Sequence, residues 1–549
     1  MNTKHLHKVL LSTVFTGLGI LVLPAQMTLA DSQMPSIHIQ TPESPFVEKT
    51  KWQDGEISIL SQTYPDIEMP ARIRGRGNST WDYGEAKRPL RFRLSAASSV
   101  FGSDYEATDW ILLANLFDAS LLRNYGALTL AKSMDMYALQ TIENTHLYVN
   151  DTYMGVYLLT DERDTGEGRL EIDFDKEAPA KSSYFIELDM RAPNEGDLNV
   201  DYILVDGLPF GFKFPSTSAM TDEHFEYLQD FMDNLSFTIR TGSFEEVAAL
   251  IDVPSFVDYY LLQELFKNSD GPLSNFMYLT GEDDNRRLHM GPAWDFDITA
   301  GIPSSLPLGD TDDAIIMGLF SLWYRPLMNM PEFFELVSVR FEELQQEAIP
   351  MMIEAISQVS QLYLSDFERN FERHPLPHTT FEAEVSFLID WLEARTLFLE
   401  EFLSVASGSF NPLSLLLELH QTDRPISISI NGDPQELNIS PIILNERVLV
   451  PLSEISNILD VTTSHDMYTN LITTQTDLVA IKNMLGSPIF YVDGTPLDLI
   501  VESLRIEDEV FIPIRILSEA LHYDISWDGE RSNLNLATRG YTRAVILVE

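Results

Sequence analysis

The sequence contains no cysteine in its 549 residues. Disulfides, thiolate metal sites, catalytic thiols and a lipid anchor on a cysteine after a leader peptide are therefore excluded. The chain must be stabilised through its cores, for which an apolar content of 44% is sufficient. Folding without disulfides suits the exterior of a Gram-positive-type bacterium, where oxidative folding is not obligatory.

Basic residues are scarce. Lys and Arg number 36 against 84 Asp and Glu, which gives a formal net charge of −48. Such a surface repels phosphate backbones and anionic membrane surfaces, so we expect no nucleic-acid partner. The simplest interpretation is solubility in a salty or alkaline medium. A specific use of the acidity, such as cation binding, is the alternative.

Long apolar runs are also scarce. Residues 9–23 form one, after a start that contains Lys4 and Lys8 and before Thr28-Leu29-Ala30, a small-residue cleavage candidate. This pattern predicts a signal peptide over residues 1–30, and hence export with no transmembrane span after cleavage. The run is short for a spanning helix, and a retained N-terminal anchor is the alternative.

The remaining chain divides near residues 406–409 into regions 31–408 and 409–549. In the first region, short alternating runs such as residues 36–39 and 87–94 predict strands, and the apolar spacing becomes helical from Thr221 to about Leu403. Before that point we also expect a helix over Leu121–Tyr137, a hairpin over His146–Leu159 and a strand over Ser183–Asp189. The fold class is therefore α+β, with a β-rich first part and a mainly helical second part.

The second region repeats itself. Residues 430–432 (Ile-Asn-Gly) recur as residues 492–494 (Val-Asp-Gly), and 448–452 (VLVPL) recur as 510–514 (VFIPI), both at an offset of 62. A constant offset over two motifs indicates duplication. Each copy of about 62 residues reads as hairpin, strand, helix and strand, which is too small to bury a core comfortably on its own.

An acidic segment between Asn268 and Gly301 carries the strongest chemical signal. Asp270 is followed five residues later by Asn275, and Asp295 lies in the run Trp-Asp-Phe-Asp at 294–297. Protein kinases place a catalytic Asp, a metal-binding Asn and a metal-binding Asp in this order. The spacing assigns Asp270 to the acceptor hydroxyl, and Asn275 and Asp295 to Mg²⁺. The alternative is a turn-rich loop whose Asn and Asp side chains close turns and cap helices.

Three basic residues are candidates for the nucleotide phosphates. Arg74 and Arg76 belong to the glycine-punctuated turn RGRGNS, whose backbone N–H groups can approach phosphate oxygens, and Lys87 begins the basic strand KRPLRFRL. Arg91 and Arg93 on that strand are rival candidates. Ordinary turn and surface-strand roles are the alternatives for all of them. Glu162 and Glu187, each at the end of an apolar strand, are candidates to pair with a phosphate-binding cation.

Other chemistries have little support. The chain has no Gly-x-Ser-x-Gly elbow and no His-Glu-x-x-His helix. His374 and His378 form the one close histidine pair outside the leader, and neither has a convincing third ligand nearby in sequence. Among so many acids nothing selects a glycosidase pair.

A set of motifs in fixed order resembles the spore coat protein H (CotH) family. They are RGRGNSTW, KRPLRFRL, DWILLANLFDASLLRN, LYVNDTYMGVYLL, YFIELD and NSDGPLSNFMY…GPAWDFD, spread over residues 34 to 403. The resemblance implies an atypical secreted or coat protein kinase with a strongly diverged, two-lobed kinase-like fold. It implies use of ATP with Mg²⁺ or Mn²⁺ and phosphorylation of Ser or Thr on proteins. Asp270 takes the catalytic position and Asp295 the metal position.

The repeat region resembles the paired stalk module named after the N-terminal domain of copper amine oxidases. NGxP, VLVPL and VFIPIR with a closing SWD carry this resemblance. His465 and His522 are its histidines and it has no thiol, so we expect no preformed copper site. The first copy has Ser453 where the second has Arg515, which suggests that the copies have diverged. Such modules imply surface adhesion or spacing.

Taken together, these features predict an exported CotH-like kinase acting on coat or cell-surface proteins, with a C-terminal module that contacts a cell-wall or envelope polymer. A rival hypothesis is a catalytically inactive structural or adhesion protein, because export places the chain where ATP is scarce. A carbohydrate-active enzyme of the envelope is a third, weaker hypothesis.

Overall fold

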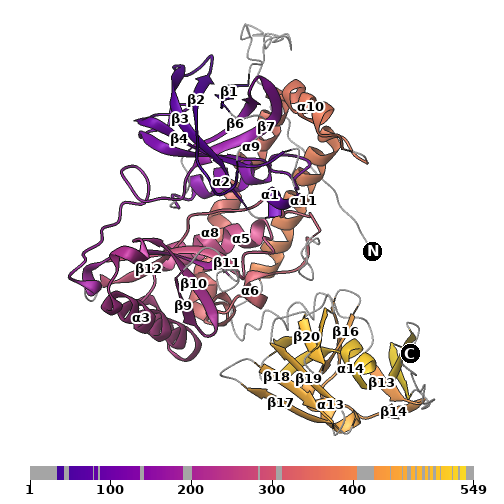
Figure 1. Cartoon of the computed structure of the whole chain (residues 1–549). Coiled ribbons are helices and arrows are strands. Elements are labelled where there is room, and N and C mark those ends of the chain that lie inside the picture. The colour runs from indigo at the N-terminus through magenta and orange to yellow at the C-terminus, as the bar shows by residue number, and fades with distance from the viewer. Residues whose placement is uncertain are drawn as a thin grey trace, which may run out of the picture.

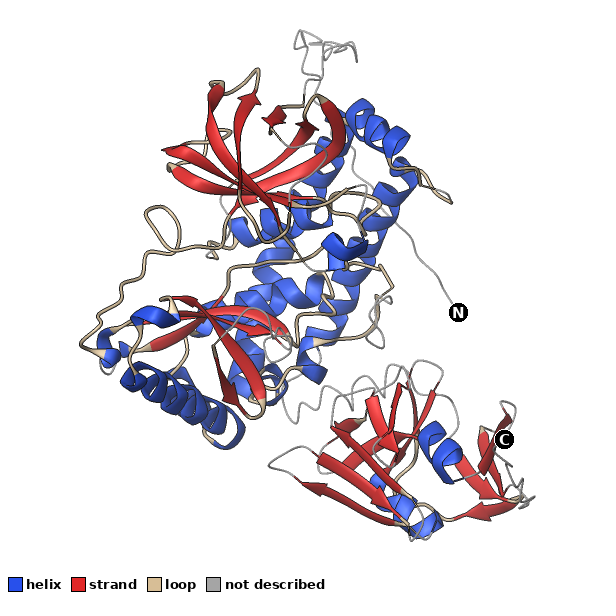
Figure 2. Cartoon of the chain, viewed as in Figure 1, coloured by secondary structure: helices blue, strands red, loops and turns tan. Residues whose placement is uncertain are grey.

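The structure is a computed structural model (Figures 1 and 2). It describes residues 34–42, 48–77, 79–83, 87–136, 141–189, 201–281, 285–303, 312–376, 378–404, 426–444, 447–459, 461–466, 471–476, 479–484, 489–492, 495–498, 503–506, 509–521, 523–528 and 532–538.

The chain first forms a closed barrel with strand order β1-β2-β3-β4-β5-β7-β6. The barrel closes because β1 pairs in parallel with β6, a strand about 110 residues later. Alternation points Ile73 and Phe92 into the apolar interior with Trp110, and leaves their arginine neighbours outside. The strands are β1 (Ser36–Gln40), β2 (Gln53–Leu60), β3 (Ile67–Gly75), β4 (Leu90–Ser98), β5 (Ala107–Leu113), β6 (Ile142–Val149) and β7 (Thr152–Asp161), with the short helix α1 (Ser79–Tyr83) after β3 and α2 (Arg123–Ser133) after β5.

A second, antiparallel sheet has the order β12-β11-β8-β10-β9. Its strands are β8 (Tyr184–Asp189), β9 (Tyr202–Val205), β10 (Leu208–Phe214), β11 (Ser274–Thr280) and β12 (Arg287–Met290). The helix α3 (Asp222–Thr241) packs along β9, and α4 (Phe244–Ala248) follows it. In Figure 1 this sheet lies below the barrel, and the connecting helices run between and behind the two.

Helices hold the barrel and the second sheet to one core. Helix α5 (Val253–Leu265) is buried along most of its length and contacts α2, α8, α11 and β12. The other helices are α6 (Met317–Phe320), α7 (Tyr324–Met328), α8 (Pro331–Gln346), α9 (Ala348–Leu362), α10 (Leu364–Arg373) and α11 (Phe381–Ser404). Helix α10 packs on β7 of the barrel. A continuous apolar core therefore runs from α2 through α5 to α11.

The C-terminal module shows the duplication in three dimensions. Each element of the first copy recurs about 62 residues later, so that β13, β14, β15, β16, α13, β17 and β18 correspond to β20, β21, β22, β23, α14, β24 and β25. The first copy comprises β13 (Ser427–Ile430), β14 (Asp433–Gln435), β15 (Ile442–Leu444), β16 (Arg447–Pro451), α13 (Leu452–Leu459), β17 (Thr462–Asp466) and β18 (Leu471–Gln475), and β19 (Ala480–Met484) links it to the second. The second comprises β20 (Ile489–Val492), β21 (Thr495–Asp498), β22 (Leu504–Ile506), β23 (Glu509–Pro513), α14 (Ile514–Leu521), β24 (Tyr523–Asp528) and β25 (Asn533–Thr538).

The two copies interlock through their strands. Val450 of β16 pairs with Ile512 of β23, its own counterpart at the offset of 62. Strand β13 of the first copy pairs with β25 of the second, whereas β19 separates the equivalent strands β18 and β20. The copies also differ at Ser453, whose N–H and hydroxyl both donate to Glu509 of the other copy, at 3.0 and 2.6 Å. The equivalent positions hold Arg447 and Arg515, two cations that cannot form this cap.

The mixed α+β class predicted from the sequence is confirmed. The first part, however, closes into a seven-stranded barrel, which is not a clear protein-kinase lobe, so the two-lobed kinase-like fold stays a prediction. Strands β11 and β12 form an antiparallel hairpin within the otherwise helical region and extend the second sheet there. Within the described residues, none of the helices combines the length and the apolar character that a membrane span requires.

The buried ion pair between helices α5 and α11 leads to a prediction about the stability of the fold. Arg395 of α11 donates to Glu264 of α5 at 3.0 Å, and both side chains are fully buried. Glu264 also accepts from the backbone N–H groups of Ile316 and Gly318. We expect Arg395→Met to lower the free energy of unfolding by about 3–5 kcal/mol, because it leaves an uncompensated buried carboxylate. Urea denaturation measures this change.

Arg340→Met is the matched control, since Arg340 pairs with Asp258 while its own side chain is 31% exposed. Its loss should cost about 1 kcal/mol or less. Equal destabilisation by the two substitutions would contradict the assignment of Arg395.

Candidate functional site

The candidate site lies where the barrel meets the segment between α5 and α6. Arg76 follows β3, and its guanidinium lies 4.9 Å from the ring centre of Trp294. Arg163 follows β7, and its guanidinium lies 4.0 Å from the same ring and 4.5 Å from that of Phe276. Two barrel loops thus bring cations onto the Trp294-Asp295-Phe296-Asp297 run.

One buried side chain ties the two predicted acids together. Asn268 accepts a hydrogen bond from the backbone N–H of Asp270 at 3.1 Å, and donates to the backbone carbonyl of Asp295 at 3.2 Å. Both aspartates are exposed. The structure therefore brings Asp270 and Asp295 to one side of the α5 terminus and presents both residues to solvent. Asn268 was missed by the sequence reasoning, although it stands two residues before Asp270.

The backbone fixes the direction of Asp295. Its φ is +67°, in the left-handed region that Asp tolerates better than most residues. The next N–H, that of Phe296, donates to Asn124 of α2 at 2.8 Å. Hydrogen bonds from two different helical regions thus hold the peptide groups on both sides of this residue.

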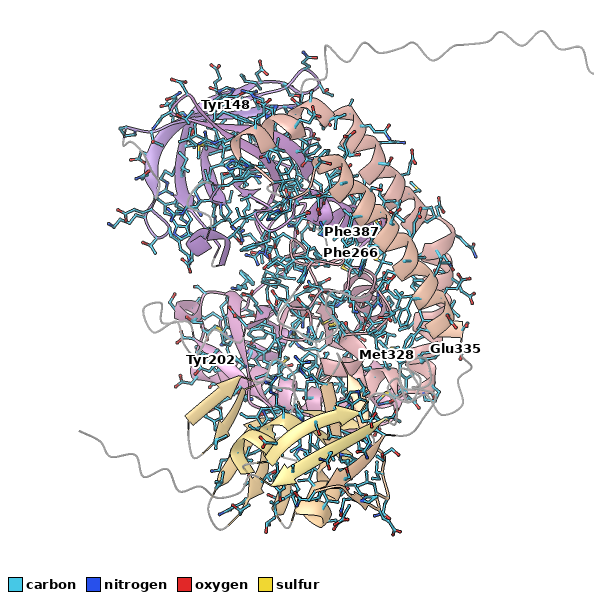
Figure 3. The ribbon with its side chains drawn as sticks, turned by 90° about the vertical axis from the view of Figure 1, so that its right-hand side faces the viewer. Tyr148, Tyr202, Phe266, Met328, Glu335 and Phe387 are labelled. Atoms are coloured by element: carbon cyan, nitrogen blue, oxygen red, sulfur yellow. The ribbon has the colours of Figure 1, made fainter. Side chains whose placement is uncertain are left out.

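Aromatic packing holds the rest of this segment. The ring of Phe266, labelled in Figure 3, lies 5.6 Å from that of Phe296 in an edge-to-face contact. Phe387 of α11, labelled in the same view, lies close to Gly301. Gly301 has φ +84°, and a Cβ there would lie 2.7 Å from both Phe387 and Trp391, so glycine is required. The segment that carries the acids is consequently clamped between α5 and α11.

Asp297 is the third acid of the site, and the sequence reasoning did not single it out. It is 8% exposed. Burial, followed by the charges of Asp295, Asp118 and Asp270, raises the pKa of Asp297 well above its ordinary value. Asp118 is connected to this segment through Arg123, which donates to Asp118 and to the backbone carbonyl of Thr299. Even so, in the described ranges no three His, Asp or Glu side chains form a ready metal cage.

Asn275 is placed differently from the two exposed aspartates. It is buried on β11, and its Oδ1 accepts a hydrogen bond from the hydroxyl of Tyr259 at 2.8 Å. Alternation along β11 puts it on the face of Met277, which belongs to the helical core, while Phe276 points to the opposite face with Arg163. No hydrogen bond joins Asn275 to Asp295 in the part of the chain that is described. Its role as a metal ligand stays a prediction.

Glu162 lies among the arginines of the site and offsets part of their mutual repulsion. Burial and the neighbouring Arg163 lower the pKa of Arg76 to about 10, opposed by Glu162 and Asp295. Glu162 accepts from Arg91 at 3.0 Å. Arg163, like Asp297, was not singled out from the sequence, although it directly follows Glu162 at the end of a strand. The second glutamate candidate, Glu187, instead forms an ion pair with Lys213 in the second sheet.

Arg74 and Lys87 lie on either side of this centre. The guanidinium of Arg74 lies 4.9 Å from the ring of Trp52, one alternation step along β3 from Arg76. Lys87 is 2% exposed, and its ammonium lies 5.5 Å from the ring centre of Tyr157. Burial lowers the pKa of Lys87 to about 7, against the opposing charge of Asp118. Within the described chain its ammonium has no hydrogen bond or ion pair.

The buried ammonium of Lys87 predicts an unusual pH dependence of stability. A lysine with a lowered native-state pKa destabilises the fold fully below about pH 7, and the destabilisation disappears as pH rises towards the unfolded value near 10.5. Lys87→Met should therefore raise the free energy of unfolding by roughly 2–4 kcal/mol at pH 6, with the gain shrinking above pH 7. Urea denaturation of both proteins from pH 6 to pH 10 measures the difference.

The exposed Lys181 provides the control, because Lys181→Met removes the same charge without removing a buried one. Parallel stability curves for wild type and Lys87→Met across this pH range would show that Lys87 is not a buried cation.

Two family models match the chain. The model described as CotH kinase protein matches residues 73–399, which include every residue of the candidate site. The model described as the copper amine oxidase N-terminal domain matches residues 429–536, which hold both copies of the repeat. No curated protein matches the chain. Both resemblances inferred from the sequence are confirmed. Because the first match covers more than half of its length, the chain belongs to the CotH kinase protein family.

Proposed function

We propose that the chain is an exported protein kinase that transfers the γ-phosphoryl group of ATP to Ser or Thr residues of cell-surface or spore-coat proteins. The proposal rests on the position of two exposed aspartates near two arginines. The exposed Asp270 and Asp295 are linked through Asn268, and Arg76 and Arg163 face them on the ring of Trp294. Phosphoryl transfer is catalysed largely by such positioning and charge neutralisation.

Each residue has a definite task in this proposal. Asp270 accepts the hydrogen bond of the acceptor hydroxyl and takes its proton as the oxygen attacks phosphorus. The guanidiniums of Arg76 and Arg163 donate to phosphate oxygens and stabilise the charge that moves onto them. Their stacking on Trp294 fixes the planes of both groups, so that little reorganisation is needed at the transition state. Lys87, which is buried and unpaired in the described chain, is a further candidate for a phosphate contact.

The acids fit a divalent cation. Asp295, with Asp297 behind it and Asn275 as the candidate from spacing, would hold Mg²⁺ or Mn²⁺ through oxygen atoms. The field that raises the pKa of Asp297 is one that a cation relieves. The lack of a closed cage among the described residues suits Mg²⁺, which usually keeps waters and substrate phosphates as ligands. When bound, the ion neutralises negative charge on the β- and γ-phosphates.

The remaining parts of the proposal concern architecture and location. The barrel takes the place of the first kinase lobe, and ATP binds between it and the helical part. Residues 1–30 direct export, and the duplicated module holds the enzyme to a cell-wall or envelope polymer. Membership of the CotH family supports association with the spore coat or cell surface.

A structural or adhesion role without catalysis is the second candidate. The closed seven-stranded barrel, together with a module of the stalk type, favours it. Thermal unfolding separates the two candidates, because ATP with Mg²⁺ raises the melting temperature of any protein whose native state binds it.

Two substitutions test the proposed roles. Asp270→Asn should lower phosphoryl transfer by at least about 100-fold while leaving the ATP–Mg²⁺ shift in melting temperature intact, because it removes a base and not a nucleotide ligand. Asp295→Asn should abolish both transfer and the Mg²⁺-dependent part of that shift. Labelling of the chain and of a Ser-rich coat protein with γ-labelled ATP measures transfer.

Asp230→Asn, an exposed change on α3, is the matched control and should leave both readouts unchanged. Unreduced labelling by the Asp270→Asn variant would exclude Asp270 as the catalytic base. A wild-type protein that neither labels nor shifts with ATP would be assigned the structural role.

A further inference from the structure

Four arginines gather on the outer face of the barrel. The arginine quartet consists of Arg72 and Arg74 on β3 and of Arg91 and Arg93 on β4. Arg72 pairs directly with Arg93, and Arg74 with Arg91, in the antiparallel register. Like charges in directly opposed positions destabilise a sheet. Such a cluster is unexpected in a chain with only 36 basic residues against 84 acidic ones, and it indicates a site for an anion.

Trp52 organises the quartet. The four guanidiniums lie 5.6, 4.9, 5.7 and 5.0 Å from its ring centre for Arg72, Arg74, Arg91 and Arg93. Contact with an aromatic face offsets part of the repulsion between the cations. It occupies the ring-facing surface of a guanidinium and leaves the N–H groups at its edge available to an acceptor.

Two internal carboxylates bond to the quartet, and both serve Arg91 or Arg93. Asp109 accepts from Arg91 at 2.7 Å and from Arg93 at 2.8 Å, and Glu162 accepts from Arg91. Burial opposes the ionised form of Asp109, but hydrogen bonds from Arg93, Thr108 and Arg91 outweigh it and lower the pKa of Asp109. Asp54 lies opposite Arg72 in the register of β2 and β3, but it forms no ion pair with Arg72 among the described residues.

Arg72 and Arg74 are the two arginines of the quartet without a bonded acceptor. Neither guanidinium has a hydrogen bond or ion pair with any residue that the structure describes, and Nε of Arg74 is buried without a partner. Burial first, and then the charge of Arg91, lower the pKa of Arg74. Because a buried donor without an acceptor is costly, an external anion that accepts hydrogen bonds fits this position.

An open groove of about 830 Å³ adjoins the quartet at Arg72 and Arg93. Its lining combines apolar residues with charged and hydroxyl groups, among them Asp54, Glu56 and Thr41, and contains no aromatic ring. A nucleotide base would find no stacking partner there, whereas an extended polypeptide can use backbone, hydroxyl and charged groups of both signs. The groove therefore favours a polypeptide as the carrier of the anion.

The position of the quartet relates it to the catalytic centre. Arg72 and Arg74 lie on one face of β3, and Arg76 follows the end of the strand at Trp294. Four residues in extended conformation at roughly 3.3 Å each place Arg72 and Arg76 about 13 Å apart. An extended substrate covers this distance in about four residues.

We propose that the quartet binds a phosphorylated serine or threonine of the polypeptide substrate, about four residues from the acceptor hydroxyl. This inference rests on the proposed kinase function and names its substrate class as segments that already carry a phosphate. Arginine binds phosphate with two parallel N–H donors, and clusters of arginine are a recurrent means of reading phosphorylated side chains.

The test measures peptide binding to the full chain without nucleotide. The probes are a Ser- and Gly-rich peptide with one phosphoserine and the same peptide with serine. Wild type should bind the phosphopeptide at least tenfold more tightly, and the double variant Arg72→Gln/Arg74→Gln should lose that preference. The control Lys176→Gln/Lys181→Gln removes the same charge at exposed positions and should retain it.

Several outcomes would overturn the proposal. The first is equal binding of the two peptides by wild type, and the second is an unchanged preference in the arginine variant. The third is displacement of the phosphopeptide by ATP that requires the same two arginines, which would make the quartet a nucleotide site. The melting temperature of the arginine variant checks folding, and loss of a like-charge pair should leave it equal or higher.

The peptide-binding assay distinguishes failure of the inference about the quartet from failure of the kinase proposal. Asp295→Asn should bind the phosphopeptide as wild type does, because no part of this assay depends on transfer. A chain that transfers phosphate without preferring the phosphopeptide would keep the kinase function and lose the inference about the quartet.

Discussion

Arg123 joins the barrel to the segment that carries the acids, and the site depends on this one side chain. It is fully buried, and it donates to Asp118 at 2.6 Å, to the carbonyl of Thr299 at 2.9 Å and to that of Ala300 at 3.0 Å. A buried guanidinium is tolerated only when its donors are used in this way. Because Thr299 and Ala300 lie two and three residues after Asp297, Arg123 anchors the segment that carries the acids to helix α2. The cations on Trp294 and the carboxylates near Asp270 belong to different parts of the fold, and they face each other because this contact holds.

The charge of the chain is distributed unevenly, and this matters more than its total. A net charge of −48 would repel any phosphorylated ligand at long range. Six arginines of the barrel and its loops nevertheless form a continuous positive band from Arg72 to Arg163, with Asp109 and Glu162 as its partners. Within a Debye length of about 8 Å, local cations govern binding more than the distant surface does. A phosphate that reaches this band experiences a positive field in an otherwise acidic protein.

Sequence periodicity predicted individual strands and helices, but it did not predict that the first strands close into a barrel. The hairpin of β6 and β7, the strand β8 and the helix α3 follow from alternation and from helical spacing. The pairing of β1 with β6 does not, because no period links residues so far apart in sequence. The same limit applies to the site. Asp270, Asp295 and Arg76 were found through motif spacing, whereas Arg163, Asn268 and Asp118 act through contacts between distant segments. Asn275 shows the reverse problem. Its spacing from Asp270 matches a kinase, but the alternation of β11 turns its side chain towards Tyr259.

The conformation of Asp295 explains how the site can hold an exposed carboxylate in a fixed direction. A left-handed non-glycine residue costs about 1–2 kcal/mol, and such a conformation persists only where the surroundings determine it. Here the determinants are backbone contacts, since the carbonyl of Asp295 accepts from Asn268 and the next N–H donates to Asn124. The side chain takes no part in either bond. The Cα–Cβ bond of Asp295 is thereby fixed in direction by backbone contacts, which leave the carboxylate oxygens out of both hydrogen bonds. An Asp that served only to close a turn would instead use its own oxygens on the neighbouring backbone N–H groups.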